Sequence, residues 1–129
     1  MNKRLLITGS VLGILGIILG AFAAHGLKQL VDVEALKSFE TGVRYQLYHA
    51  FLLLILGGTS FVNTKVKRSI LYLVIIGLVF FSGSIYGLAT NALSGFDFKT
   101  IAFITPIGGL LLIIAWLVML IGIIRNKVD

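Results

Sequence analysis

The sequence predicts an all-α integral membrane protein, a bundle of four transmembrane helices in one domain (residues 1–129), with a short amphipathic interfacial helix between the first two spans. Three observations lead to this fold class. The chain is 58% hydrophobic and 12% charged, with a mean hydropathy of +1.06, whereas soluble domains are about 45–50% apolar. Its apolar residues form long runs. Its basic residues lie in short blocks between those runs.

The charge and cysteine content exclude several functions. The formal net charge is +6, but short basic blocks beside apolar runs are topology signals and do not form the aromatic-interleaved stripe of nucleic-acid-binding proteins. We therefore expect membrane lipids, and no nucleic acid, as partners. The chain has no cysteine, which excludes disulfides and thiolate metal sites.

The first predicted span covers about residues 5–26. Lys3 and Arg4 precede an uncharged run that ends at Ala24, and about 20 apolar residues suffice to cross a bilayer. A cleaved signal peptide is the competing interpretation, because residues 21–23 resemble a small-residue cleavage site. Such peptides have apolar regions of about 7–15 residues, so the longer run favours a retained helix.

Glycines recur along one face of this span, at Gly9, Gly13, Gly16 and Gly20. Spacings of three and four place small residues where another helix backbone can approach closely. Glycine is also common in membrane helices generally. The stripe favours helix packing, and it leaves open whether the partner belongs to the same chain.

An interfacial segment is predicted at about residues 28–41. It carries both signs of charge, and Glu40 and Arg44 form an i,i+4 pair. Its apolar residues recur every three positions, at Leu30, Val33, Leu36 and Phe39. This pattern is typical of an amphipathic helix that lies in the membrane interface.

Three further spans complete the bundle, at about residues 43–62, 70–90 and 101–124. A basic loop (63–69) and a polar turn (91–100) separate them. With four crossings, both termini and the basic loop lie on one side. That side holds seven of the eleven basic residues: Lys3, Arg4, Lys65, Lys67, Arg68, Arg125 and Lys127. The positive-inside rule then places both termini in the cytoplasm.

The unusual polar side chains of the spans, which include an arginine and two histidines, fall in the outer half of this arrangement, and we expect them to form one ligand-binding site. On the second span, four of them lie within an arc of about 140° at 100° per residue. Ionisable side chains in a membrane helix usually face the bundle interior. The candidate site residues are His25, Glu40, Arg44, Tyr45, Tyr48, His49, Ser82, Ser84, Tyr86 and Thr105.

Each of these residues also has a structural interpretation. Arg44 can extend to the bilayer surface, and the tyrosines can be interfacial aromatics. His25 and His49 have no carboxylate on the same face, so we predict no metal, while a proton-linked role for the two histidines stays open.

The third and fourth spans contain residues that favour close or irregular packing. Gly83 and Gly87 are four apart and predict a close helix contact. Pro106 is expected to loosen the first turns of the fourth span. Two loosened segments at one depth are typical of a broken-helix binding site, although close packing explains them equally well.

The sequence resembles the small bacterial membrane proteins of the YwdK and YgdD type, known as domain of unknown function 423. Four segments carry the resemblance, GAFAAHGLK (20–28), FETGVRYQLYHA (39–50), FSGSIYGLA (81–89) and TPIGGLLLIIAW (105–116). Ala115 stands where the family tends to have glycine, which bears on one helix contact. The family called transmembrane protein 256 looks similar. The resemblance implies four helices in the plasma membrane and no assigned biochemistry.

The leading functional hypothesis is a non-enzymatic membrane protein, expected to be a homo-oligomer, whose outer polar cluster binds a lipid headgroup, a small solute or a partner. The alternative is a small proton- or anion-linked transporter or channel. An enzyme is disfavoured because the carboxylates lie in loops, the interfacial segment and the tail, and no H-E-x-x-H or paired Asp motif occurs. We expect no cofactor.

Overall fold

The structure, a computed structural model, describes residues 2–126, and every element of regular structure in that range is helical. The all-α prediction is confirmed for this part of the chain. The longest helices are α1 (Asn2–Ala24), α2 (Val33–Gly58), α3 (Thr64–Leu78) and α5 (Ile104–Arg125). Helix α3 continues through a π-helical turn, η2 (Val79–Gly83), into α4 (Ser84–Ala89). Short 3-10 turns form η1 (Leu27–Gln29), η3 (Asn91–Leu93) and η4 (Phe98–Ile101).

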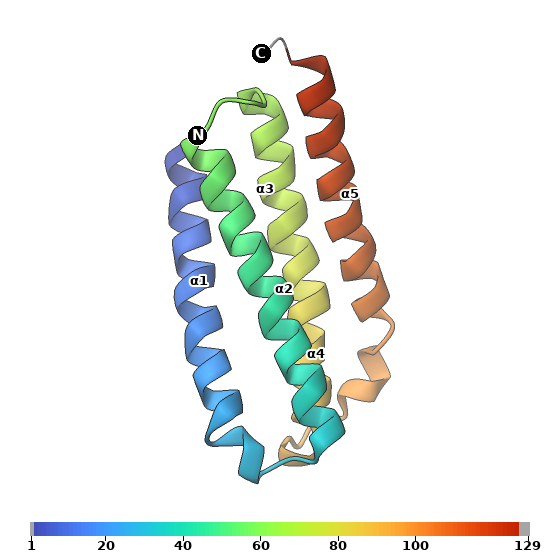
Figure 1. The fold of residues 1–129 in the computed structure, drawn as a ribbon. Coiled ribbons are helices and arrows are strands. Elements are labelled where there is room, and N and C mark those ends of the chain that lie inside the picture. Colours follow the sequence, from blue (N-terminus) through green and yellow to red (C-terminus); the bar gives the residue numbers. More distant parts are fainter. Residues whose placement is uncertain (1, 127–129) are drawn as a thin grey trace.

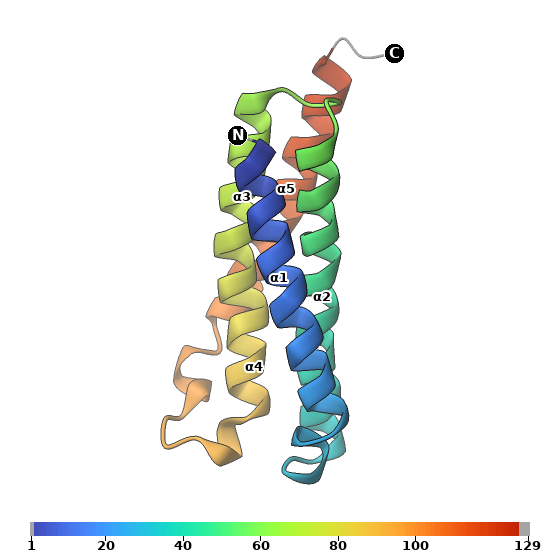
Figure 2. The ribbon, with the colours of Figure 1, turned by 90° about the vertical axis from the view of Figure 1, so that its left-hand side faces the viewer.

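Helix α1, helix α2, the continuous α3–η2–α4 rod and helix α5 lie side by side, and successive rods run in opposite directions (Figures 1 and 2). Helix α1 packs mainly against α2, and α5 packs mainly against α3 and η2. The start of α1, the loop of residues 59–63 and the end of α5 lie at one end, which we call the basic end. The turns η1, η3 and η4 lie at the other, the mixed-charge end.

Hydrogen bonds join the segments at the basic end. Lys67 Nζ donates to Asn2 Oδ1 at 2.8 Å, which ties α3 to the start of α1. Asn126 Nδ2 donates to Ser60 O at 3.3 Å, which ties the end of α5 to the loop after α2. Segments distant in the sequence therefore meet here.

Three stretches within the described residues are long and apolar enough to cross a membrane: Asn2–Gln29, Thr64–Ala89 and Ile104–Arg125. They support an integral membrane protein. Helix α2 is not among them, although its 26 residues make it longer than α5. Its first half carries charged and polar side chains that lower its mean hydropathy.

The separate interfacial helix expected at about residues 28–41 is not present. Helix α2 begins at Val33, where Asp32 is the N-cap and its side chain accepts a hydrogen bond from Ala35 N at 2.8 Å. The helix then continues unbroken to Gly58. No proline interrupts it, and Phe39 and Val43 extend the same buried face on which the later core residues lie.

Helices α3 and α5 also begin at positions that differ from the sequence-based bounds. Helix α3 starts at Thr64, because Asn63 caps it by accepting a hydrogen bond from Val66 N at 2.9 Å. Helix α5 starts at Ile104, so Pro106 lies in its first turn, where a missing N–H costs little. Residues 101–103, the expected start of the fourth span, form the end of a 3-10 turn and a turn instead of α-helix, so irregular backbone lies just before Pro106. A second irregular segment is the π-helical turn η2.

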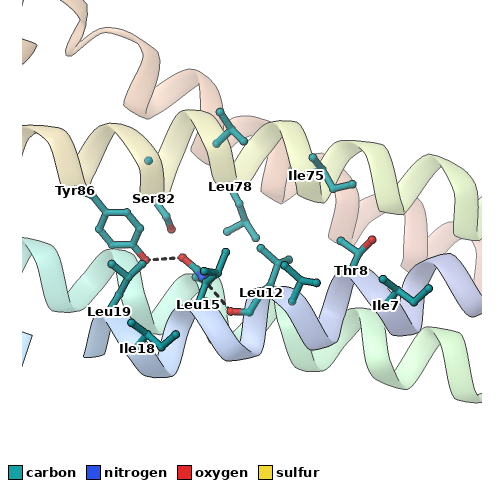
Figure 3. A pocket seen from close by; sticks show the side chains of 14 residues that line it. Ile7, Thr8, Leu12, Leu15, Ile18, Leu19, Ile75, Leu78, Ser82 and Tyr86 are labelled. Atoms are coloured by element: carbon teal, nitrogen blue, oxygen red, sulfur yellow. Dashed lines mark hydrogen bonds between the residues drawn. The ribbon is translucent and has the colours of Figure 1, made fainter. Parts of the chain in front are cut away.

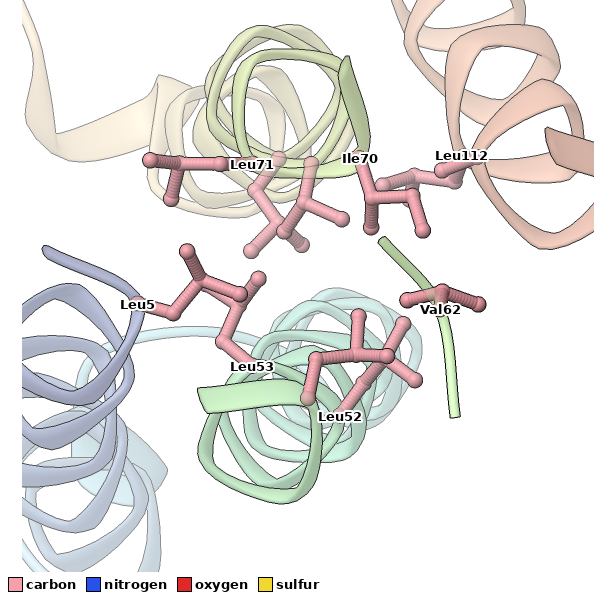
Figure 4. Close-up of a cluster of buried hydrophobic side chains, with 11 residues drawn as sticks. Leu5, Leu52, Leu53, Val62, Ile70, Leu71 and Leu112 are labelled. Atoms are coloured by element: carbon pink, nitrogen blue, oxygen red, sulfur yellow. The ribbon is translucent and has the colours of Figure 1, made fainter. Parts of the chain in front are cut away.

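Two buried apolar clusters hold the rods together. The larger lies toward the basic end and joins side chains of α1, α2, the 59–63 loop, α3 and α5 (Figure 4). The smaller lies toward the mixed-charge end and includes Leu27, Phe39 and Val43. The outward faces are also apolar, as at Ile124, which is 72% exposed. Helices that are apolar on every face suit a membrane environment.

The predicted glycine stripe of α1 packs in part against α2 of the same chain. A Cβ atom on Gly9 would lie 2.9 Å from a carbonyl oxygen of α2, and one on Gly16 would lie 2.7 Å from a leucine methyl carbon of α2. Gly20 has ordinary contact distances, and Gly13 has no neighbour within 4 Å. Two of the four glycines therefore bring α1 close to α2.

The two glycines of the third span that were predicted to make a close helix contact also differ in the space around them. A Cβ atom on Gly87 would lie 2.6 Å from the ring of Phe98, so Gly87 lets η4 pack against α4. A Cβ atom on Gly83 would have only one neighbour, Leu78 O at 3.9 Å. The space beside Gly83 is open.

Candidate functional site

Gln46 links three helices near the middle of the bundle. Its side chain is 5% exposed. Its Nε2 donates to Leu12 O of α1 at 2.9 Å, and its Oε1 accepts a hydrogen bond from the Tyr86 hydroxyl of α4 at 2.7 Å. The amide therefore ties α2 to both neighbouring helices.

The π-helical turn adds a second polar contact beside Gln46. Ser82 is buried, and its hydroxyl donates to Gly42 O of α2 at 2.8 Å. Gly42 permits this approach, because a Cβ atom there would lie 2.7 Å from the Tyr86 ring. The polar groups of Gln46, Ser82 and Tyr86 thus lie together between α1, α2 and the α3–η2–α4 rod.

His49 pairs with Trp116 on α5. His49 is 3% exposed. Its Nδ1 lies 2.7 Å from Tyr45 O, which can only accept, and its Nε2 lies 3.1 Å from Trp116 Nε1, which can only donate. These two partners require a neutral imidazole with the proton on Nδ1. His49 therefore acts as a hydrogen-bonded link between α2 and α5.

A third polar contact joins α4 and α5. The hydroxyls of Ser84 and Thr105 lie 2.5 Å apart, and the Ser84 hydroxyl also bonds the carbonyl oxygen of Phe81 at 3.0 Å. Within residues 2–126, every buried side-chain nitrogen and oxygen has a hydrogen-bond partner. These polar groups stabilise helix contacts, as polar side chains between membrane helices commonly do.

The side chains of the remaining predicted site residues are exposed and form no hydrogen bond with these groups. His25 and Glu40 are exposed. Arg44 is also exposed, and its guanidinium donates to Thr41 Oγ1 on the same helix at 3.0 Å. Tyr45 is 40% and Tyr48 is 52% exposed. The single outer site expected from the sequence is therefore divided.

A groove lies between α1 and the α3–η2–α4 rod, and its volume is about 510 Å³. It forms because α1 packs against α2 and makes few contacts with α3. Figure 3 shows side chains of the two walls facing each other across it. The lining residues are Ile7, Thr8, Val11, Leu12, Leu15, Ile18, Leu19, Gln46, Ile75, Leu78, Val79, Ser82, Gly83 and Tyr86. We call it the lateral groove.

Sequence reasoning did not select Gln46 or Trp116 as site residues. Gln46 lies on the stripe formed by Val43, Ala50 and Leu53, within about 80° of helix rotation, and a polar residue in the centre of an apolar stripe indicates burial. Trp116 gave no such signal, because its contact with His49 depends on how α5 packs. In residues 2–126 no three His, Cys, Asp or Glu side chains converge as metal ligands would.

Comparisons with known proteins identify similar chains. The family described as "Protein of unknown function (DUF423)" matches residues 19–109. A UPF0382 membrane protein of Haemophilus influenzae is 35% identical over 127 residues, which is 98% of each chain. The UPF0382 membrane protein YwdK of Bacillus subtilis is 33% identical, over 95% of this chain and 98% of its own length. The UPF0382 inner membrane protein YgdD of Escherichia coli is 34% identical, over 98% and 93% respectively. No solved structure matches the chain.

Proposed function

Because the chain belongs to the DUF423 family, whose relatives are named membrane proteins, we propose that it is a non-enzymatic membrane protein that binds a membrane lipid in the lateral groove. The observation that carries this proposal is the position of the groove. It opens sideways between two rods whose outer faces are apolar, where the surrounding solvent is acyl chain. A lipid can enter it directly from the bilayer.

The shape and lining of the groove fit a long apolar chain. On α1 the lining extends from Ile7 to Leu19, about 18 Å at 1.5 Å per residue. Its walls are almost entirely aliphatic, and its volume of about 510 Å³ is within the range of small-molecule sites. The walls therefore favour an acyl or isoprenoid chain over a soluble metabolite.

Polar atoms of Gln46 and Tyr86 lie about midway along the groove, because Gln46 bonds Leu12 O, and they offer hydrogen bonds to a polar group of the lipid. Gln46 Nε2 carries two N–H donors, and the bond to Leu12 O uses one of them. The Tyr86 hydroxyl donates to Gln46 and retains its lone pairs. An ester, carbonyl or hydroxyl oxygen of a lipid can bond here, while the apolar chain lies against the aliphatic side chains of α1.

The transporter or channel alternative has less support. Its proposed path residues are divided, because Arg44 and His25 are exposed and His49 is bonded to Trp116. The core toward the basic end is aliphatic. The polar groups that remain inside serve helix contacts, so they do not form a continuous hydrated path.

Filling the groove is expected to expel the lipid. A leucine at Gly83 has open space in front of its Cβ atom and projects from a residue that lines the groove. Gly83→Leu should therefore reduce co-purified lipid at least fivefold in native mass spectra. Gly13→Leu is the matched control, because Gly13 is equally open but does not line the groove.

Equal lipid retention in both variants would contradict the lateral-groove proposal. The same spectra, recorded on particles that keep native lipid, also test the proposed homo-oligomer, which the large exposed apolar surface of the helices favours. A strictly monomeric mass would remove that part of the proposal.

We also propose that four rods cross the membrane, α2 included, with both chain ends in the cytoplasm. The alternation of rod directions and the excess of cations at the basic end support this topology.

The absence of cysteine provides a clean background for a labelling test of this topology. A membrane-impermeant maleimide should label exposed Ala92→Cys in intact cells, and should label exposed Ser60→Cys only after permeabilisation. Labelling of both residues from outside would contradict the topology.

A further inference from the structure

A second groove lies at the basic end, between the first turn of α3 and the last turns of α5. Its volume is about 290 Å³. It uses different helix faces from those of the lateral groove. Its lining residues are Asn63, Val66, Val118, Ile121, Gly122, Arg125 and Asn126.

This groove is apolar at its inner part and polar at its mouth. Val118 and Ile121 lie on α5 toward the bundle middle, whereas Arg125 and Asn126 lie at the helix end. The distance along α5 from Val118 to Asn126 is about 12 Å at 1.5 Å per residue. A molecule that fits must have a polar head and an apolar tail.

Hydrogen-bond donors are present at the mouth. Asn63 Oδ1 is occupied by its cap bond to Val66 N, so the side chain's amide nitrogen is left as a donor. The guanidinium of Arg125 adds a planar set of donors that matches phosphate oxygens. Both residues line the groove. The mouth thus offers a cation and a neutral donor to an anionic head.

The charge distribution favours an anion at this end. Six described cations lie here, namely Lys3, Arg4, Lys65, Lys67, Arg68 and Arg125. Four of the chain's five carboxylates, Asp32, Glu34, Glu40 and Asp97, belong to the mixed-charge end, and Asp129 lies outside the described residues. The described charged side chains at this end are therefore all positive, which favours an anion beside Arg125.

We propose that this groove binds one anionic phospholipid. The phosphate oxygens accept hydrogen bonds from Arg125 and Asn63, and one acyl chain lies against Val118 and Ile121. Basic pockets between membrane helices bind such headgroups. The proposal goes beyond lipid binding in the lateral groove, because it names a second site, a charged lipid class and different residues.

The test uses the full-length protein, delipidated in neutral detergent and titrated with phosphatidylglycerol or phosphatidylcholine, with bound lipid counted by native mass spectrometry. We expect Arg125→Gln to weaken phosphatidylglycerol binding on the order of fivefold, the effect of one basic residue near an anionic lipid. Lys65→Gln, which removes an exposed cation of the same end outside the groove, should change it less than twofold.

An independent variant tests the apolar part of the site. Ile121→Trp fills the groove from an exposed position, so it should expel the lipid and leave the fold intact. Gly83→Leu should leave phosphatidylglycerol binding at this site unaffected. This result separates failure of the present inference from failure of the lateral-groove proposal. Any of three results would overturn the inference. They are equal losses of phosphatidylglycerol binding in Arg125→Gln and Lys65→Gln, equal affinity for phosphatidylcholine, and competition by inorganic phosphate alone at similar concentration.

Discussion

Gly108→Ala is expected to force α5 away from α3 and η2 and to lower the free energy of unfolding by about 3 kcal/mol. A Cβ atom at this position would lie 2.7 Å from the Phe80 carbonyl carbon and 2.8 Å from Gly77 O, and nearer still to Phe81 N. All three are backbone atoms, so no side-chain rotation relieves the overlap. Unfolding of the purified protein in mixed micelles, titrated with sodium dodecyl sulfate, measures the effect.

Gly109→Ala is the matched control for this prediction. A Cβ atom there would lie 3.5 Å from the Phe81 ring, which is an ordinary van der Waals distance. Alanine also favours the helix over glycine by about 1 kcal/mol, so this variant should be as stable as the original chain or more stable. If the two alanine variants were equally stable, the close crossing of α5 over η2 would be wrong.

The order and direction of the rods follow from sequence, because apolar runs and the turns between them are local features. The caps at Asp32 and Asn63 are local too, since each side chain bonds a backbone N–H three residues ahead. The expected boundary near residue 42, between an interfacial segment and the second span, was wrong. Opposite charges suggested an interfacial segment, but the buried stripe through Phe39 and Val43 continues without a break.

The candidate site was harder to predict, because burial depends on which helix face meets a neighbour. Arg44, Tyr45 and Tyr48 share an arc, and that arc points away from the stripe that contains Gln46. The stripe itself was readable from the sequence. The lateral groove was not, because it forms only when α1 packs on α2 and leaves a gap beside η2.

The buried polar side chains bear on function through the hydrogen bonds that they already make. Buried polar groups in the described residues are all bonded to other parts of the protein. In the proposed lipid binding, selectivity depends on donors that those bonds leave over, such as the second Gln46 N–H, and on the grooves between rods. A membrane protein with satisfied internal polarity and lateral grooves is suited to hold lipid, and less suited to pass ions.

His49→Ala is expected to loosen the contact between α2 and α5 and to lower the free energy of unfolding by about 3 kcal/mol. The change removes a ring from a position that is 3% exposed, and it leaves the Trp116 indole N–H without its acceptor. Trp116 is the only tryptophan of the chain, so its fluorescence reports the local change directly. The emission wavelength and the detergent unfolding curve should shift together.

His49→Gln separates this structural role from proton transfer. A glutamine side-chain oxygen can accept the indole hydrogen bond, so this variant should recover at least half of the stability lost in His49→Ala. It carries no titratable proton. If His49→Gln kept the Trp116 emission and the stability but abolished a proton or anion flux into proteoliposomes, His49 would belong to a conducting path. The paired hydrogen bonds of His49 predict a different result. We expect no flux in the original chain or in His49→Gln, and we expect His49→Gln to recover the stability.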